Sequence, residues 1–279
     1  MCRVLNVSAS AFYAWRSRPP CAHEQRDHEL ASQIEQVFQQ SRGRYGSPRV
    51  HQELRAMGEV CSQKRVARLM RERQLAVTAK RAFVATTDSK HAYPMAPNVL
   101  NRRFGVEQVA DVNRVWAGDI TFIPTAKGWL YLAVVLDLKS RKVIGWSMAD
   151  TMEQKLVHQA LSLALGQRLP KPTEEGLLFH SDRGSQYAAH HYQDHLKRWK
   201  IVASMSGKGN CWDNAPVESF FATLKKELIY RENYQTHEQA KASLFYYIEV
   251  FYNRQRRHSA LGYKSPHDYE LSLLSKSPS

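Results

Sequence analysis

Residues 115–123 read Val-Trp-Ala-Gly-Asp-Ile-Thr-Phe-Ile, an apolar run with one acidic residue, Asp119, at its centre. A charge inside such a run is costly unless a cation or hydrogen-bond donors meet it, so Asp119 on a buried strand is a candidate metal ligand. Two further acids stand in comparable places. Asp182 ends the apolar run 177–181 just before an Arg-Gly-Ser turn, which predicts the carboxyl end of a strand, and Glu218 follows with 35 residues between the two acids. The pattern indicates three carboxylates that meet at one point.

Glu218 is expected in the first turn of a helix. Asp213 or Asn214 can cap that helix, and Pro216 suits its start. The apolar residues that follow repeat with the spacing of a core-facing stripe, namely Val217, Phe221, Leu224 and Leu228. Lys225 comes two turns after Glu218, so we expect it on the same helix face.

Three converging carboxylates repel one another unless divalent cations sit between them. Ligands that are all oxygen suit two Mg²⁺ or Mn²⁺ ions, and a pair about 3.5–4 Å apart can support displacement at a phosphodiester. The expected substrate is therefore nucleic acid.

Several motifs around these acids match one known family. Asp119 lies in Trp-x-x-Asp-Ile-Thr, Asp182 lies in His-Ser-Asp-Arg-Gly, and thirty-five residues separate Asp182 from Glu218. The other matching features are the run from Gly209-Asn210 to Asp213-Asn214-Ala215, the basic Lys225, and a closing motif of Tyr252-Asn253, Arg256, His258, Leu261 and Pro266. Over nearly its whole length the chain resembles the OrfB transposase subunit of the IS-three group of bacterial insertion sequences, whose catalytic core is similar to that of retroviral integrases.

This resemblance implies an α/β fold with a ribonuclease-H-like, integrase-type core and a mixed five-stranded sheet. It implies a DNA transposase in which Asp119, Asp182 and Glu218 hold the metal and catalyse Mg²⁺-dependent strand cleavage and 3′-hydroxyl strand transfer. The expected partners are the double-stranded DNA ends of the element, the target DNA, further copies of the chain and the upstream-frame (OrfA) product. The family's basic residue implies that Lys225 contacts a DNA end.

Composition is consistent with these expectations. A net charge of +14 favours a polyanionic partner, and no apolar run reaches the roughly 18 residues of a spanning helix, so no membrane association is expected. Four scattered cysteines indicate free thiols in a reducing cytoplasm. The resemblance implies that this cytoplasm is bacterial and that the protein lies close to the nucleoid DNA. We expect a helical segment over 1–23, a helical, helix-turn-helix-like domain over 24–74, a basic extended linker over 75–107, the catalytic core over 108–270, and a tail over 271–279.

The helical domain carries a basic helix, with apolar residues facing inward and the charged residues Lys64, Arg65, Arg68 and Arg71 outside. These four are candidate phosphate contacts, although such a run also suits a merely solvated face. The opening segment 7–15 looks like the last helix of a helix-turn-helix, and a short packing helix is the alternative. Near the core, Lys208 is a candidate phosphate contact, Trp212 either stacks on a base or plugs the core edge, and Arg256 is counted among the DNA contacts.

Alternative roles remain open for other residues. Asp137 also ends an apolar run, but its surroundings favour a turn. Asp213 competes with Glu218 as third ligand, although it also suits a helix cap. The histidines His190, His191 and His195 suggest zinc, for which no matching ligand group is present. The rival functions are a ribonuclease-H-fold nuclease that never joins strands and a DNA-binding protein without activity.

Overall fold

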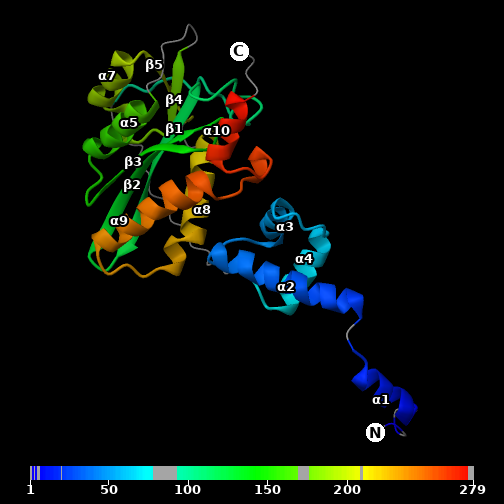
Figure 1. Cartoon of the computed structure of the whole chain (residues 1–279). Coiled ribbons are helices and arrows are strands. Elements are labelled where there is room, and N and C mark those ends of the chain that lie inside the picture. The colour runs from blue at the N-terminus through cyan, green and yellow to red at the C-terminus, as the bar shows by residue number, and fades with distance from the viewer. Residues whose placement is uncertain are drawn as a thin grey trace. The chain divides into compact units, whose positions relative to one another are not determined.

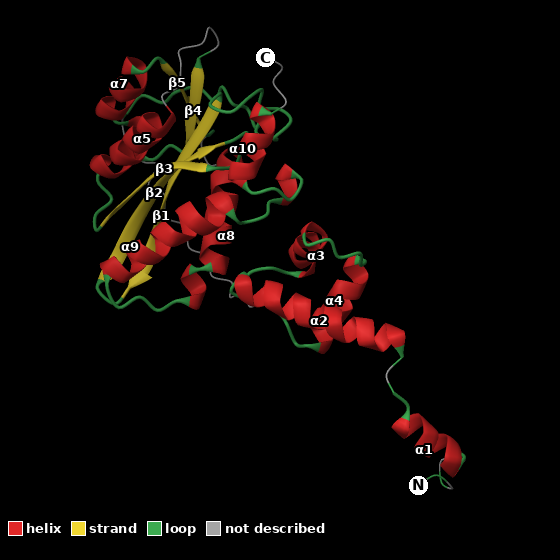
Figure 2. Cartoon of the chain, viewed as in Figure 1, coloured by secondary structure: helices red, strands yellow, loops and turns green. Residues whose placement is uncertain are grey.

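The computed structural model describes residues 2, 4, 7–19, 21–77, 93–168, 176–207 and 210–275. The chain divides into two compact units, Met1–Thr78 and Ala79–Ser279. Figure 1 labels their elements, and Figure 2 shows that the first unit is helical whereas the second contains the sheet. None of the helices in the described ranges combines the length and apolarity needed to span a bilayer.

The first unit has the predicted helical character. Its helices are α1 (Ala9–Ser17), α2 (Ala22–Gln40), α3 (Ser47–Ala56) and α4 (Gln63–Glu72). The last three pack around a shared apolar core of Leu30, Ile34, Val37, Val50, Leu54, Val66, Leu69 and Met70. The Ser62 hydroxyl caps α4 by accepting from the Arg65 N–H at 3.2 Å. α1 buries none of its residues, so it does not act as a packing helix within the described residues.

The second unit is built on a five-stranded sheet. Its strands are β1 (Val115–Thr125), β2 (Gly128–Asp137), β3 (Val143–Ala149), β4 (Leu177–Ser181) and β5 (Ile201–Met205), in the order β3-β2-β1-β4-β5. The first three strands form an antiparallel meander, and β4 and β5 add to it in parallel. This is the mixed sheet expected of a ribonuclease-H-like core.

Helices cover both faces of the sheet (Figures 1 and 2). One face carries α5 (Gln154–Arg168), α6 (Ser185–Ala188) and α7 (His190–Arg198) over a core that includes Trp116, Phe179 and Tyr192. The other carries α8 (Ala215–Glu227), α9 (His237–Phe245) and α10 (Pro266–Leu274). Short helical segments join them: η1 (Cys211–Asn214), η2 (Ile229–Arg231), the π-helical η3 (Tyr246–Tyr252) and η4 (Ser259–Leu261).

Several predicted boundaries were wrong. Thr151 and Gln154 have the spacing of a capping box and Gly166 suits a helix stop, so the sequence predicts a helix between Thr151 and Gly166. The helix instead begins at Gln154 and continues to Arg168, and the Thr151 hydroxyl donates to Glu153. Gly166 is tolerated inside it, since a single glycine costs only about 1 kcal/mol there. The predicted tail over 271–279 overlaps α10, which ends at Leu274.

The predicted linker also differs from the structure where it is described. From residue 93 onward the chain packs against the second unit: Leu100 is buried, and the Val99 and Leu100 N–H groups donate to the Ser204 hydroxyl. The Lys139 ammonium donates to the Val106 carbonyl at 2.9 Å. Segment 93–107 is thus a belt held on the catalytic unit; the basic pair at residues 80–81 lies outside the described residues.

Candidate active site

Two of the three acids lie at the ends of neighbouring strands. β1 pairs in parallel with β4, and this pairing runs from Val115 opposite Leu178 to Gly118 opposite Ser181. Continued by one residue, the same register brings Asp119 beside Asp182. The predicted convergence of these two aspartates therefore follows directly from the strand pairing.

The strands can approach this closely because position 118 is a glycine. A Cβ at Gly118 would lie 2.6 Å from the Cζ of Phe179 on β4 and 3.4 Å from the Tyr187 ring. Backbone donors then orient the two carboxylates: the Ile120 N–H donates to Asp119 at 2.7 Å. Gly184 N–H donates to Asp182 at 2.9 Å, so the turn after β4 fixes the second acid.

Glu218 lies in the first turn of α8, as predicted, and the predicted apolar stripe of that helix is buried. The start of the helix is tied to β1 by the Asn214 side-chain amide, which donates to the Gly118 carbonyl at 3.3 Å. Neither Asp213 nor Asn214 caps the helix with its side chain, which corrects that expectation. The tie instead anchors α8 one residue away from Asp119.

Electrostatics show that the three carboxylates are close enough to interact. Burial raises the pKa of Asp119 well above its ordinary value, and the negative charges of Asp182 and Glu218 add to that effect. Partial burial and the charge of Asp182 likewise raise the pKa of Glu218. Negative charge is therefore concentrated here without enough compensation from the chain.

Lys225 is the basic residue at this site. Burial lowers the pKa of its ammonium, and the charge of Asp119 opposes that shift, so the two groups interact electrostatically. Its Nζ lies 5.1 Å from the centre of the Phe122 ring on β1. Lys225 of α8 therefore interacts with Asp119, one of the three acids.

The acids do not form a closed metal cage as they stand. Within the described ranges, no three His, Cys, Asp or Glu side chains are grouped so that they could hold a metal ion. The donor set nevertheless fits a hard divalent cation, because it consists of carboxylate oxygens whose raised pKa values reflect uncompensated negative charge.

The two competing aspartates have structural roles. Asp137 is buried, and its carboxylate accepts from the backbone N–H groups of Asn113, Lys139 and Ser140, which confirms the predicted turn. Asp213 is also buried and accepts from the Gly207 N–H at 2.8 Å. Both carboxylates are satisfied without a metal.

The histidines outside the carboxylate site pair with one another. The Nδ1 atoms of His158 on α5 and His195 on α7 lie 3.1 Å apart, and their rings are nearly parallel, at 12°. His191 packs edge-on to His158. This arrangement supports a shared hydrogen bond between two helices and gives no support to the zinc interpretation.

The predicted DNA contacts lie in different environments. Trp212 is 68% exposed, so it does not plug the core edge, and Lys208 lies outside the described residues. Lys64 and Arg71 are exposed on α4. Arg65 and Arg68 instead form ion pairs with Asp27 of α2, both at 2.6 Å, so a phosphate would have to compete with that carboxylate.

The prediction that Arg256 contacts DNA was wrong. We expected it to contact DNA, but it is only 4% exposed and its guanidinium pairs with the buried Glu227 of α8 at 2.8 Å. The Tyr247 hydroxyl donates to the same carboxylate. Arg256 therefore holds the C-terminal helices together and is not available to a phosphate.

Sequence reasoning missed the polar support beneath Asp182. His180 is fully buried and contacts the Ser204 hydroxyl at 2.9 Å and the Ser206 hydroxyl at 3.3 Å. Burial lowers the pKa of His180 to about 4, so it is neutral at physiological pH and serves as a strut between β4 and β5. The alternating serines at 204 and 206 were the available signal.

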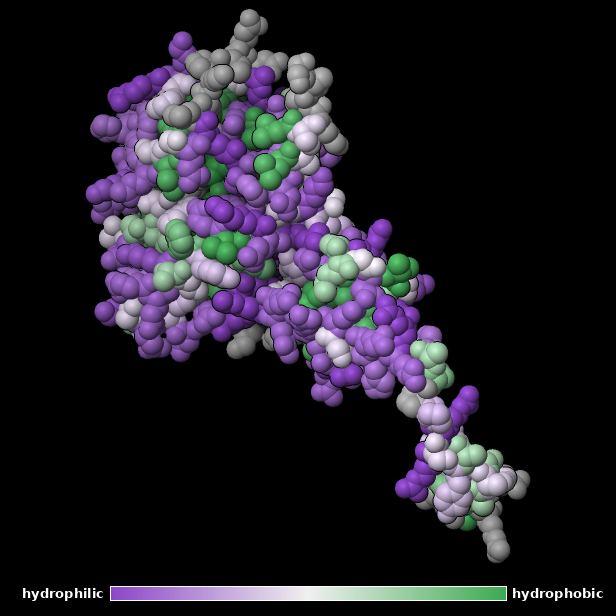
Figure 3. All heavy atoms as spheres, viewed as in Figure 1, coloured by the Kyte–Doolittle hydropathy of each residue, from purple (hydrophilic) through white to green (hydrophobic). Residues whose placement is uncertain are grey.

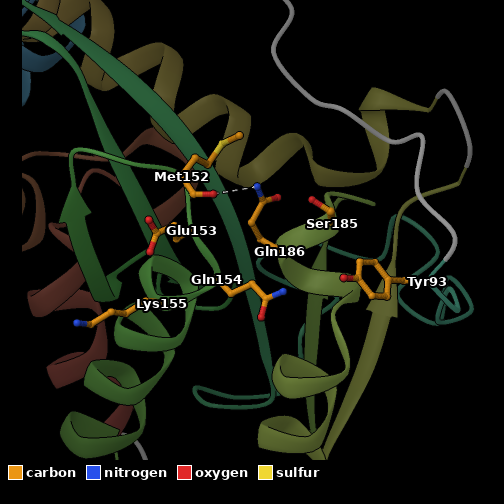
Figure 4. Close-up of a pocket in the computed structure, with 7 residues that line it drawn as sticks. All are labelled: Tyr93, Met152, Glu153, Gln154, Lys155, Ser185 and Gln186. Atoms are coloured by element: carbon orange, nitrogen blue, oxygen red, sulfur yellow. Dashed lines mark hydrogen bonds between the residues drawn. The ribbon is translucent and has the colours of Figure 1, made fainter.

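A separate pocket of about 460 Å³ opens between the start of α5 and α6 (Figure 4). Its lining residues are Tyr93, Met152, Glu153, Gln154, Lys155, Ser185 and Gln186. The Gln186 amide donates to the Met152 carbonyl at 3.3 Å across it. None of the three acids lines this pocket, so it is distinct from the carboxylate site.

Comparison with known proteins identifies the family of this chain. Residues 110–211 and 190–266 match a family described as "Integrase core domain", and residues 24–83 match "HTH-like domain". "Transposase InsF for insertion sequence IS3A" of Escherichia coli (strain K12) is 44% identical over 277 residues, which cover 98% of this chain and 94% of that protein. "Insertion element IS600 uncharacterized 31 kDa protein" of Shigella sonnei is 41% identical over 95% of this chain and 96% of that protein.

Solved structures that match this chain share less of their sequence with it. A simian T-cell lymphotropic virus intasome chain superposes with a TM-score of 0.46 at 14% identity, over 88% of this chain and 75% of that chain. The catalytic domain of Mos1 mariner transposase gives 0.45 at 16% identity, over 64% of this chain and 91% of that chain. On the identity and coverage of its sequence relatives, this chain belongs to the IS3 family of insertion-sequence transposases, with an HTH-like domain and an integrase catalytic core.

Proposed function

We propose that Asp119, Asp182 and Glu218 are the catalytic residues with which this transposase cuts DNA at the ends of its insertion sequence and transfers the freed 3′ hydroxyl. The observation that carries the proposal is the shared register of β1 and β4, which sets Asp119 beside Asp182, together with the electrostatic influence of Glu218 on Asp119. This register and this influence support a site shared by three acids from distant parts of the chain.

The three carboxylates are the residues that would hold two Mg²⁺ or Mn²⁺ ions. Bound there, such ions would supply Lewis acidity toward the attacking and leaving oxygens of a phosphodiester. Two backbone hydrogen bonds orient the carboxylates that would bind these cations: the Ile120 N–H donates to Asp119, and the Gly184 N–H donates to Asp182. The anchored start of α8 completes the arrangement by presenting Glu218.

The reaction consists of two phosphodiester displacements at one site. In the first, a water oxygen bonds to phosphorus, the bond from phosphorus to the 3′ oxygen breaks, and that oxygen leaves as a hydroxyl. In the second, this 3′ oxygen bonds to another phosphorus and displaces its former 3′ oxygen. Each step exchanges one P–O bond for another, so no covalent link to a serine or tyrosine of the chain is required.

DNA binding is assigned to groups on both units. Lys225 lies next to the acids, where its ammonium would neutralise the phosphate beside the one that reacts. Trp212 exposes a ring on which a base would stack, and Lys64 and Arg71 would contact the backbone from the helical unit. Hydrophilic residues dominate the visible surface in Figure 3.

The partners we propose are the element's ends, the target DNA, further copies of this chain and the product of an upstream reading frame. Its site of action would be the bacterial nucleoid. Recognition of two ends by one assembly requires at least two binding units, which favours a homo-multimer.

The test incubates the protein, with and without the upstream product, with duplexes carrying the element's inverted repeats in Mg²⁺. Cleavage at the repeat and strands joined through an oligonucleotide 3′ hydroxyl are expected, and Asp119→Asn should abolish both while DNA affinity is unchanged or higher. Cleavage without joining would identify a simple nuclease instead. Binding without any Mg²⁺-dependent chemistry would identify a non-catalytic DNA-binding protein.

A further inference from the structure

One buried carboxylate, that of Asp213, joins the two ends of the connection between β5 and α8 by a hydrogen bond. Asp213 lies at its end and accepts from the Gly207 N–H at 2.8 Å, near its beginning. Asn98 of the belt 93–107 donates to the same Oδ2 atom at 3.0 Å. Residues 208–209 of this connection lie outside the described part of the chain, but its two ends are held together at Asp213.

The belt adds a second and more exposed partner, Arg102. Its Nε donates to Asp213 Oδ1 at 2.8 Å, and a terminal guanidinium nitrogen donates to the Asn210 side chain at 2.7 Å. The Arg102 side chain is 50% exposed whereas that of Asp213 is 3% exposed, so the ion pair joins a half-exposed guanidinium to a buried carboxylate. Burial works to raise the pKa of Asp213, but the Gly207 N–H and Arg102 outweigh it and hold the pKa below its ordinary value.

The backbone at Arg102 lies in the left-handed region. Arg102 has φ of +58° and Asn101 has φ of +45°, both in the left-handed region that residues with a Cβ disfavour. Asn98 stabilises this turn by accepting the Asn101 N–H at 2.9 Å. A glycine would adopt this conformation more readily, so the arginine is placed here despite its backbone preference.

The contacts lead from Arg102 to the carboxylate site in a short chain. Asp213 is followed by Asn214, whose amide donates to the Gly118 carbonyl next to Asp119. α8 begins at the next residue, and Glu218 lies in its first turn. Asp213 thus directly precedes the residue that ties the start of α8 to β1.

We propose that Arg102 and Asp213 form a clasp that positions the first turn of α8, and with it Glu218, against Asp119 and Asp182. Both are positioning residues, and neither touches the reacting atoms. The inference rests on the proposed function of the three carboxylates. The competing explanation is that the half-exposed Arg102 contacts a DNA phosphate directly.

The test compares Arg102→Met, which removes the charge and keeps the apolar stem, with Arg103→Met. Arg103 is a matched control, because it neighbours Arg102 and its guanidinium donates only weakly, to the Val99 carbonyl at 3.4 Å. Amide hydrogen exchange is followed on the full-length protein without DNA. Single-turnover cleavage is then measured at saturating DNA, and the DNA dissociation constant is measured separately.

For Arg102→Met we expect amide exchange at residue 207 and across 210–220 to accelerate about tenfold or more, since the closing contact is lost. The cleavage rate at saturation should fall about 10- to 100-fold, because a small misplacement of a catalytic group is enough to do so. DNA affinity should equal that of Arg103→Met. Arg102→Lys, which can reach only one of the two acceptors, should recover part of the rate.

Two results would overturn the clasp. One is an amide exchange rate at residue 207 and across 210–220 that is the same in Arg102→Met as in Arg103→Met. The other is weakened DNA binding with an unchanged rate at saturation, which would make Arg102 a phosphate contact. If the unaltered protein shows no cleavage, the proposed function fails, and the exchange measurement still decides whether the clasp exists.

Discussion

Replacing Arg256 by methionine is expected to destabilise the catalytic unit rather than weaken DNA binding. The Arg256 guanidinium contacts both oxygens of Glu227, with Nε at 2.9 Å from Oε2 and a terminal nitrogen at 2.8 Å from Oε1. Both side chains are buried, at 4% and 7% exposure. In the variant, Glu227 would keep the Tyr247 hydrogen bond at 2.9 Å but lose its counter-charge.

Breaking one half of a buried ion pair costs about 3–5 kcal/mol, a large part of the stability of an ordinary domain. For a unit of this size that loss lowers the midpoint of thermal unfolding by about 6–20 °C. The control is Arg254→Met, which removes an exposed arginine two residues earlier.

Urea and thermal unfolding compare the stability of Arg256→Met with that of Arg254→Met. A fluorescence anisotropy titration compares their affinity for DNA. Adding Glu227→Gln to Arg256→Met should recover part of the lost stability, because the unpaired buried charge is removed. Equal unfolding of Arg256→Met and Arg254→Met, with DNA affinity reduced only in Arg256→Met, would refute the reasoning and restore the DNA role.

Three further outcomes are expected. Gly118→Ala should lower stability by about 1–3 kcal/mol in urea unfolding and reduce cleavage, since its Cβ would lie 2.6 Å from the Phe179 ring. Burial, and then the neighbouring His195, lower the pKa of His158, so the unfolded chain binds a proton at a higher pH than the folded chain does. The free energy of unfolding should therefore decrease below about pH 6.5. In unfolding scans from pH 8 to 5, this decrease should be smaller for His158→Gln. Without metal, Asp119→Asn should raise the free energy of unfolding by about 1–2 kcal/mol, because a buried carboxylate repelled by its neighbours is removed. The variant should therefore have a higher midpoint of thermal unfolding than the unaltered protein, and an equal or lower midpoint would contradict this.

Much of the site could be predicted because its acids follow local patterns. Asp119 and Asp182 stand in or after apolar runs that form buried strands, and such runs are recognisable without knowledge of the fold. Glu218 could be placed in a helix by the apolar repeat that follows it, and this helix begins where expected. Each of these predictions depends on residues within a few positions of the acid.

Predictions failed where the deciding partner was distant in sequence. Arg256 looks like a surface cation until Glu227, 29 residues earlier, is seen to share its burial. The belt 93–107 lacks periodicity, so it resembled a free linker, yet its backbone is bound by Ser204, which is more than 100 residues away. Asp213 looked like a helix cap, but its partners come from the belt and from Gly207.

The metal claim is tested most directly by crystals of the protein grown with Mn²⁺, measured for anomalous scattering. The account predicts two peaks about 3.5–4 Å apart, each bound by oxygens from the group Asp119, Asp182 and Glu218, with the peaks lost in Asp119→Asn. Anomalous peaks that avoid these side chains, or no peak at Mn²⁺ concentrations that support cleavage, would contradict it.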